Sequence, residues 1–483
     1  MQERGNPDFL EPWPGNRYSG RVTEPSRLRQ LTIDNIAIVS SMQIFCKLVT
    51  LVRSILLARL LLPEDFGILA IGGTLLNFFN QFSGAGITQA IVRKDKVDER
   101  TWEVAFTANL LLSAFIFLGV FFLAPSWGTL VNNPRAVTVT RLLGLVTVMA
   151  ACSFLPSTRL LKEANFRKTL WPTLLPLAID TSVSLFLAWH GWGYWSLVLG
   201  IVASQATALL AYWYVAPFRF RLAWDTAIVR DLFSYGKNVL GTSVLIFISI
   251  NVGDFLVQKY LGTASLGFYA VAFRWGSFST LEVVHVVSRV LFPAFSLIKN
   301  DIARVRAAFL ETLEHLAFLI FPLSLGFLAV APEFVHGLLG AKWEPIILPL
   351  QILCVMGLSR GLNALSGTLC HGLGRADILF WFALFWAVII PPALYLAVPR
   401  FGVLGCCWVM AGSEVLGNVI NFARTRYLIH FTLGETLRRL QWPALNGLLM
   451  IAAVSLLRPL LPWPPRVNLT LLVTTGAATY LAG

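Results

Sequence analysis

Charged side chains inside long apolar stretches are the residues best placed to do chemistry in this chain. The stretch 264–290 holds a set of them: Arg274, Glu282, His285 and Arg289. A helical advance of ~100° per residue places this set within roughly an 80° arc of one face. A charge at the bilayer centre costs about 2.5–3.5 kcal/mol, so such a face is expected to line a wet or protein-filled interior. For His285 alone, a hydrogen-bonded packing role is the plainer interpretation.

A second set of cations, Lys47 and Arg53, lies in the first apolar stretch. Together with Arg274 they would line a cationic cavity for an anionic headgroup. Arg donates hydrogen bonds to phosphate in pairs, and Lys acts as a point charge. The alternative is an internal ion pair, such as Arg274 or Arg289 with Glu282. Arg289 would also serve as an anchor at its helix end.

Isolated acids in other apolar stretches are candidates for ion coupling. Asp254 lies beside Asn251 and Gln258; it would bind a proton or cation, or else form a salt bridge or cap. Asp180 and Glu414 are single acids in apolar surroundings. Each would bind a coupling ion or stay protonated and neutral within the bundle.

The composition is that of a multi-pass membrane protein. Of the 483 residues, 56% are hydrophobic and 13% are charged, whereas soluble domains have about a quarter charged. The net charge of +13 is explained by basic cytoplasmic loops, so nucleic acid is not an expected partner. The six cysteines lie in apolar segments without C-x-x-C spacing, which argues against a disulfide framework or a metal site.

Sequence signatures of ATP-hydrolysing enzymes and of zinc proteases are missing. There is no G-x-x-x-x-G-K-[ST] or H-E-x-x-H pattern, so we expect no ATP hydrolysis, no catalytic residues and no cofactor. The N-terminal region does not show a charged segment followed by an apolar segment and a cleavage site. We therefore expect no removable signal peptide.

The apolar stretches predict an all-α fold of about 14 transmembrane helices joined by short links. Most of the 38 Lys and Arg residues fall in alternate links, which predicts that both termini are cytoplasmic. The expected organisation is two pseudo-symmetric six-helix lobes plus a C-terminal helix pair. Its predicted parts are a cytoplasmic tail (1–32), an N-terminal lobe (33–216), a cytoplasmic linker (217–236), a C-terminal lobe (237–424) and a two-helix extension (425–483).

An internal repeat links the two predicted lobes. A shift of about 200 residues places Arg59 on Lys259 and Gly67 on Gly267. An even number of spans separates the matched positions, so the two halves run the same way through the membrane. This predicts a parallel repeat with the substrate at the seam between the halves.

Several short motifs resemble a known family through their order and spacing. They are Leu57-Ala58-Arg59-Leu60, Pro63-Glu64-Asp65-Phe66-Gly67, Leu266-Gly267-Phe268-Tyr269, Phe292-Pro293-Ala294-Phe295-Ser296, Leu339-Gly340-Ala341-Lys342-Trp343 and Gly372-Leu373-Gly374-Arg375-Ala376-Asp377. The family is the polysaccharide-transporter branch of the multidrug/oligosaccharidyl-lipid/polysaccharide exporter superfamily, the Wzx-like flippases. The chain departs from it at Gly84, where the family often has an acid.

The resemblance implies two six-helix lobes with a C-terminal pair, and a central cavity lined by the first two helices of each lobe. It also implies transfer of a polyprenyl-diphosphate-linked oligosaccharide across the cytoplasmic (inner) membrane for exopolysaccharide or lipopolysaccharide synthesis. We therefore expect a non-enzymatic flippase that works by alternating access. The expected partners are the lipid-linked oligosaccharide and membrane lipid, with a polysaccharide polymerase or export proteins as candidate protein partners. The alternatives are a cation-coupled multidrug exporter, and a membrane glycan ligase or polymerase.

Overall fold

The computed structural model describes residues 25–81, 87, 91, 97–162, 166–217 and 221–482, with only the backbone described in parts of α1, α8 and α9 and at Phe166 and Ala376. These ranges contain no β-strand, which confirms the predicted all-α class. The elements in chain order are α1 (Pro25–Leu60), α2 (Pro63–Asn80), α4 (Glu99–Leu130), α5 (Pro134–Lys162), α6 (Phe166–Trp189), α7 (Tyr194–Val215), α8 (Thr226–Leu261), α9 (Thr263–Ile298), α10 (Ile302–Phe334), η2 (Val335–Leu339), η3 (Ala341–Ile346), α11 (Ile347–Gly372), α12 (Ala376–Ile429), α13 (Leu433–Leu457), η4 (Arg458–Leu460) and α14 (Pro465–Ala482).

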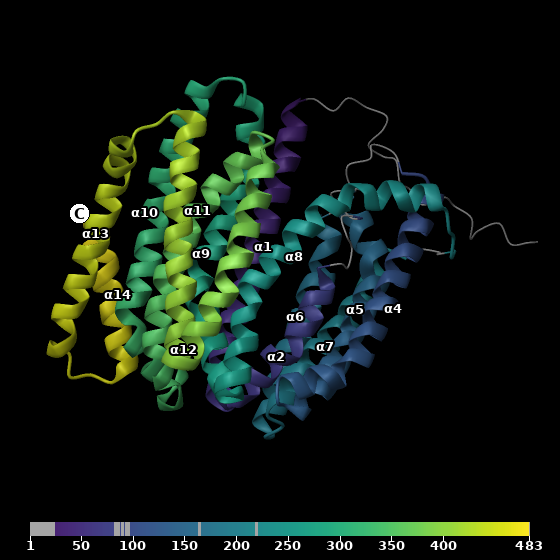
Figure 1. The fold of residues 1–483 in the computed structure, drawn as a ribbon, viewed down its shortest axis with the longest axis horizontal. Helices are drawn as coiled ribbons and strands as arrows, with labels where there is room; N and C mark the ends of the chain where they lie inside the picture. The colour runs from purple at the N-terminus through teal and green to yellow at the C-terminus, as the bar shows by residue number, and fades with distance from the viewer. Residues whose placement is uncertain are drawn as a thin grey trace, which may run out of the picture.

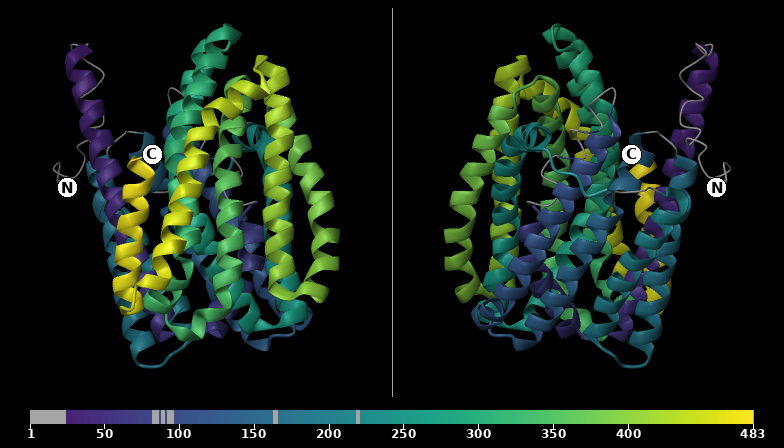
Figure 2. Two further views of the ribbon diagram at one scale, coloured as in Figure 1. Left: turned by 90° about the vertical axis from the view of Figure 1, so that its left-hand side faces the viewer. Right: turned by 90° about the vertical axis from the view of Figure 1, so that its right-hand side faces the viewer.

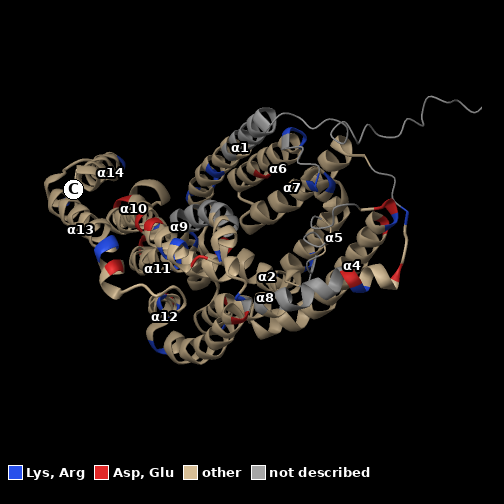
Figure 3. Ribbon diagram, turned by 90° about the horizontal axis from the view of Figure 1, so that it is seen from above, with Lys and Arg blue, Asp and Glu red and all other residues tan. Residues whose placement is uncertain are grey.

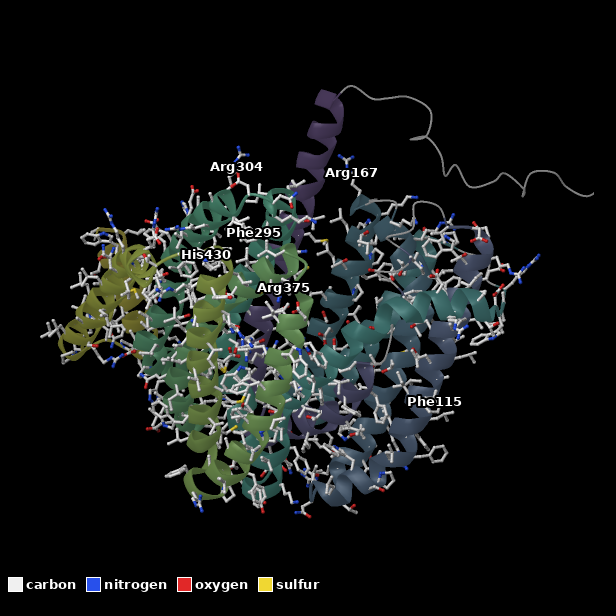
Figure 4. All side chains as sticks on the ribbon, turned by 45° about the horizontal axis from the view of Figure 1, so that its top comes forward. Phe115, Arg167, Phe295, Arg304, Arg375 and His430 are labelled. Atoms are coloured by element: carbon white, nitrogen blue, oxygen red, sulfur yellow. The ribbon has the colours of Figure 1, made fainter. Side chains whose placement is uncertain are left out.

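The helices have the length and composition of membrane spans. Within the described residues, ten helical segments are long and apolar enough to cross a bilayer. Large apolar side chains also cover the flanks; Phe115 of α4, for example, is 73% exposed and projects from the side of the molecule (Figure 4). Helices satisfy their own backbone hydrogen bonds, which hydrocarbon requires. The chain is a multi-pass membrane protein, and the count of 14 spans stays a prediction.

The longest element, α12, is two helices joined at a sharp bend. It covers 54 residues, and Gly402 within it has φ 63° and ψ −146°, a conformation that glycine adopts without the steric cost of a Cβ atom. The bend separates the predicted apolar stretches 376–397 and 402–423 into two arms that run in opposite directions (Figure 1).

The helices gather into two groups, here called the first bundle (α1, α2 and α4–α7) and the second bundle (α8–α14). In the first, α4 packs on α5, α6 on α7 and α1 on α6; in the second, α11 packs on both α9 and α12, and α8 on α12. The long helices run roughly along one direction in both side views (Figure 2), and the view along them shows α1 and α9 at the border of the bundles (Figure 3). The predicted lobe boundaries remain predictions; α8 begins at Thr226, within the predicted linker.

The two ends of the bundles differ in their turns. The α1–α2 end carries the α1–α2 turn, the α8–α9 turn at Gly262 and the η2–η3 turn at Gly340. At the opposite end, called the α7–α8 end, Arg167 and Arg304 project away from the helices (Figure 4). The start of α2 is capped locally: Asp65 accepts a hydrogen bond from the Leu62 backbone N–H at 2.8 Å, which satisfies one donor left open there.

The C-terminal helix pair is fixed to α10 near both of its ends. Arg306 and Glu314 of α10 form ion pairs with Glu435 and Arg439 of α13. At the other end, Arg458 Nε lies 2.7 Å from Glu333 Oε1. Between them, Gly447 and Gly326 allow α13 and α10 to approach closely, because a methyl at Gly447 would come within 2.6 Å of Leu325. The C-terminal helix pair is therefore held rigidly against the second bundle.

Candidate functional site

A largely buried ion pair joins α1 and α6 in the first bundle. Arg53 Nη1 lies 2.5 Å from Asp180 Oδ2, and Arg53 Nη2 donates to Asp180 Oδ1 at 2.7 Å. The third nitrogen, Nε, donates to Ser184 Oγ at 3.0 Å. The exposed fractions of the two charged side chains are only 13% and 14%. The pairing is bidentate, the strongest geometry between a guanidinium and a carboxylate.

Arg274 of α9 brings a second cation to this pair from the other bundle. It is close enough to interact electrostatically with both Arg53 and Asp180. Its side chain is exposed, and among the described residues it has no hydrogen-bond or ion-pair partner. The seam between the bundles thus holds two cations and one acid, a cluster (Arg53, Asp180 and Arg274) that we call the seam cluster.

The sequence predicted a shared location for Arg53 and Arg274, and the structure brings the two together. It also places Asp180 there, which had been assigned to a separate ion-coupling group. The partners Arg53 and Asp180 are 127 residues apart, and nothing in either local sequence signals the contact. An uncompensated charge in an apolar stretch was the only indication that each needed a partner.

The other predicted cavity residues are less closely tied to the seam cluster. Lys47 lies on α1 with an exposed side chain, and its role stays a prediction. Glu282, His285 and Arg289 belong to α9, but their side chains lie outside the described part of the structure. The proposed alternative pairing of Arg274 or Arg289 with Glu282 is therefore neither supported nor contradicted.

Asp254 occupies a different position, within the second bundle. Tyr269 of α9 and Cys406 of α12 are its electrostatic neighbours. Packing here is tight: a methyl at Gly253 would come within 3.0 Å of Cys406 Sγ. Among the described residues, the Asp254 carboxyl has no hydrogen-bond or ion-pair partner. An unpaired acid between three helices keeps the ion-coupling prediction open.

Glu414, the third candidate acid, is paired. Its Oε1 accepts hydrogen bonds from Arg360 Nε at 2.8 Å and from Arg360 Nη2 at 2.6 Å. The pair connects α11 to the second arm of α12, and the Arg360 guanidinium also lies 5.7 Å from the centre of the Phe273 ring. Arg360 therefore acts as an interhelical contact, and ion coupling by Glu414 stays a prediction.

The seam is closed at the α1–α2 end by two glycines that the repeat matched. A methyl at Gly67 of α2 would lie 2.0 Å from the Thr263 carbonyl oxygen of α9. A methyl at Gly267 of α9 would lie 1.8 Å from the Pro63 carbonyl oxygen of α2. Pro63 and Thr263 are the first residues of α2 and α9. Each helix start therefore meets the fifth residue of its repeat counterpart, an arrangement related by a pseudo-twofold axis.

Two cations and an indole extend this closure, and we call these contacts the seam lock (Arg59, Lys342 and Trp343). Arg59 Nε and Nη2 donate to the carbonyl oxygens of Leu338 and Gly337 at 2.6 and 2.5 Å. In return, Lys342 Nζ donates to the carbonyls of Arg59 and Leu61 at 2.7 and 2.6 Å. Trp343 Nε1 donates to the Ala58 carbonyl at 2.7 Å. Each bundle thus supplies donors for the carbonyls left open at a helix end of the other.

A small polar group completes the closed end. Asn133 Nδ2, from the α4–α5 turn, donates to Thr263 Oγ1 at 2.9 Å. Gln258 Nε2 of α8 donates to the same hydroxyl at 3.1 Å and to the Val131 carbonyl at 3.2 Å. The sequence had placed Gln258 beside Asp254 as a polar neighbour, but the structure uses it to join the bundles.

Comparison with known proteins identifies relatives in polysaccharide biosynthesis. The chain is 28% identical to the succinoglycan biosynthesis transport protein ExoT of Rhizobium meliloti, over 69% of this chain and 67% of that protein. It is 25% identical to the lipopolysaccharide biosynthesis protein WzxC of Escherichia coli, over 77% and 76%. It is 24% identical to the teichuronic acid biosynthesis protein TuaB of Bacillus subtilis, over 82% and 83%.

Solved structures share the fold at low sequence identity. The lipid II flippase MurJ in an inward closed conformation matches with a TM-score of 0.76 at 14% identity, over 92% of this chain and 97% of MurJ. An inward-facing multidrug resistance transporter of the MATE family and MOP superfamily matches with a TM-score of 0.63 at 14% identity, over 82% and 98%. Residues 56–348 match the family described as polysaccharide biosynthesis protein. The chain belongs to this polysaccharide biosynthesis protein family.

Proposed function

We propose that this chain is a flippase that moves a lipid-linked oligosaccharide across the cytoplasmic membrane by alternating access. The single observation that carries the proposal is the seam cluster: two arginines from different bundles meet at a seam that is closed at one end. The transport and biosynthesis roles named for the relatives agree with it. In this role the chain is a transporter and not an enzyme.

The net positive charge of the seam cluster favours an anionic substrate. Arginine donates paired hydrogen bonds to phosphate oxygens, so a diphosphate between Arg53 and Arg274 would contact both bundles at once. The substrate is then a polyprenyl-diphosphate-linked oligosaccharide whose lipid tail stays in the bilayer. We assign four further residues to the lining of the predicted cavity around the seam cluster: Lys47, Glu282, His285 and Arg289.

Orientation follows from the distribution of basic residues. The α7–α8 end carries Arg167 and Arg304, and an excess of Lys and Arg marks cytoplasmic loops. We therefore assign the α7–α8 end and both termini to the cytoplasm. The closed α1–α2 end faces outward, so the cluster is reached from the cytoplasm in this conformation.

Alternating access then requires the α1–α2 end to open. Rocking of the bundles would separate Gly67 from Thr263 and Gly267 from Pro63, and it would break the seam lock. Asp254 is the strongest candidate for binding a coupling ion, since its carboxyl is unpaired among the described residues, whereas Asp180 and Glu414 already have arginine partners. Candidate protein partners are a polysaccharide polymerase or export proteins.

The proposal is tested with Arg53→Ala and Arg274→Ala, alone and together. The readout is delivery of the lipid-linked sugar to the outer leaflet in a strain that lacks the native gene and carries each variant. Each single change is expected to reduce transport at least about tenfold, a loss of roughly 1.4 kcal/mol of binding. Arg304→Ala is the matched control, because Arg304 is 77% exposed and lies outside the seam. Undiminished transport by the double variant, at normal membrane levels, would overturn the role of the cluster.

A further inference from the structure

Each fork of paired N–H groups on Arg53 already has a partner in this conformation. Two of its nitrogens bind Asp180, at 2.5 and 2.7 Å, and the third binds Ser184 at 3.0 Å. A guanidinium recognises carboxylate and phosphate with the same planar fork of N–H groups. A phosphate that binds Arg53 in this way must therefore take the place of the Asp180 carboxylate.

Arg274 is in the opposite situation. Its side chain is exposed, and it has no hydrogen-bond or ion-pair partner among the described residues. An incoming anion would meet Arg274 first and then compete with Asp180 for Arg53. The two arginines of the cluster thus differ in how available they are to an anion, and this difference comes from Asp180.

The surroundings of Asp180 fit a carboxylate held in a defined position. Gly200 of α7 faces it so closely that a methyl there would lie 2.7 Å from Asp180 Oδ1 and 3.0 Å from Ser184 Cβ. A larger residue would push against the carboxylate and Ser184 together. Ser184 Oγ in turn donates to the Asp180 carbonyl at 2.5 Å, which leaves its oxygen directed to Arg53 as an acceptor. Ser184 and Gly200 are therefore positioning residues for the pair.

We propose that Asp180 is a displaceable counter-ion that occupies Arg53 in place of the substrate phosphate. Binding of a diphosphate separates Asp180 from Arg53, and re-formation of the pair expels the diphosphate when the site opens on the other side. Displacement leaves a carboxylate without its cation in a largely buried site, which is unfavourable. Asp180 thereby lowers the affinity for the substrate and speeds its release, as a transport site requires. This inference rests on the proposed function of the seam cluster.

The test measures binding of geranyl diphosphate to the purified full-length chain in lipid nanodiscs, with geraniol as the control for the apolar tail. Asp180→Asn keeps the shape of the side chain but removes the competing charge. We expect it to bind the probe about tenfold more tightly than the native chain and to transport more slowly. Asp180→Ser is a second, smaller replacement in case the amide disturbs folding, which size-exclusion profiles would reveal.

A double-variant cycle separates competition from a structural role. In the presence of Asp180→Asn, adding Arg53→Ala should abolish the gain in affinity, because the freed arginine is its source. Equal or weaker binding by both Asp180 variants, with Arg53→Ala still harmful in the native background, would overturn the counter-ion role alone. If Arg53→Ala and Arg274→Ala also leave binding unchanged, the proposed function itself fails. The two failures are therefore distinguishable.

Discussion

Lys342 and Arg59 cap each other's backbone across the seam between the bundles. Lys342 Nζ donates to the Arg59 carbonyl at 2.7 Å, while the Arg59 side chain donates to the carbonyls of Gly337 and Leu338 in η2. Cations at the end of a helix are favoured by its dipole. Because every one of these contacts crosses the seam, they hold the α1–α2 end closed only while the bundles stay together.

Lys342→Gln should shift the protein toward a state that is open at the α1–α2 end. The change removes a charge-assisted contact to two carbonyls, worth about 1–3 kcal/mol in a site of this kind, or roughly a tenfold change in the population of the open state. Labelling of an Ala70→Cys reporter on α2 by a membrane-impermeant maleimide measures the shift. Arg400→Gln removes an exposed charge in the bend region of α12 and should leave labelling as it was; equal labelling in both variants would show that the seam lock does not hold the closed state.

Gly67→Ala should prevent full closure of the same end. The added methyl would lie 2.0 Å from the Thr263 carbonyl oxygen, so α2 and α9 would have to separate. Overpacking of this kind costs about 1–3 kcal/mol, and it should lower the melting temperature in detergent and reduce transport. Gly73→Ala is the control on the same helix, because its methyl would find its nearest neighbour, Asn77 Nδ2, only at 3.9 Å. Gly67→Ala with native stability and transport would contradict the tight contact.

Arg360→Ala should destabilise the second bundle. It leaves Glu414, with 20% of its side chain exposed, without its cation, and loss of one member of a buried pair costs about 3–5 kcal/mol. Thermal unfolding in detergent measures the effect, and Arg360→Leu combined with Glu414→Leu should recover much of the loss. The matched control is Arg375→Ala, whose pair with Asp377 is about half exposed (51% and 57%); because solvent screens such a pair, its loss should change the unfolding temperature much less.

Asp254→Asn should separate substrate binding from transport. Asp254 lies in the second bundle near Tyr269 and Cys406, away from the seam cluster, so binding of geranyl diphosphate should persist. If Asp254 binds the coupling ion, transport should fall at least about tenfold, and it should lose its dependence on the ion gradient. Glu311→Gln is the control, an exposed acid on α10. Full transport with unchanged gradient dependence would remove Asp254 from the coupling role.

Structural features that depend on the local sequence alone, such as the helices, could be predicted from the sequence. Long apolar runs with few charges predicted the helices, since hydrocarbon permits few other structures. Gly67 and Gly267 were matched by the repeat, and the structure shows why: both sit where another backbone passes within contact distance. The repeat predicted a shared seam but gave no hint that these two glycines meet there.

Features made by packing could not be predicted in the same way. The sequence identified Arg53 as a buried charge but not Asp180 as its partner, because the contact depends on how α6 is rotated against α1. In the sequence, Lys342 stood out only as part of the motif Leu339-Gly340-Ala341-Lys342-Trp343. Its actual role needs the Arg59 carbonyl, which becomes a partner only after η3 folds against the end of α1. Hydrophobic and charge patterns carry no information about such pairings.

The attachment of α13 to α10 has a practical consequence. Arg306 and Glu314 of α10 bind α13 near its start, and Glu333 of α10 binds Arg458 directly after its end. A fluorophore placed on the C-terminal pair therefore follows the second bundle as a rigid body. Paired with a second dye on α4 or α5, it would report the distance between the bundles in single molecules without touching a residue of the transport path.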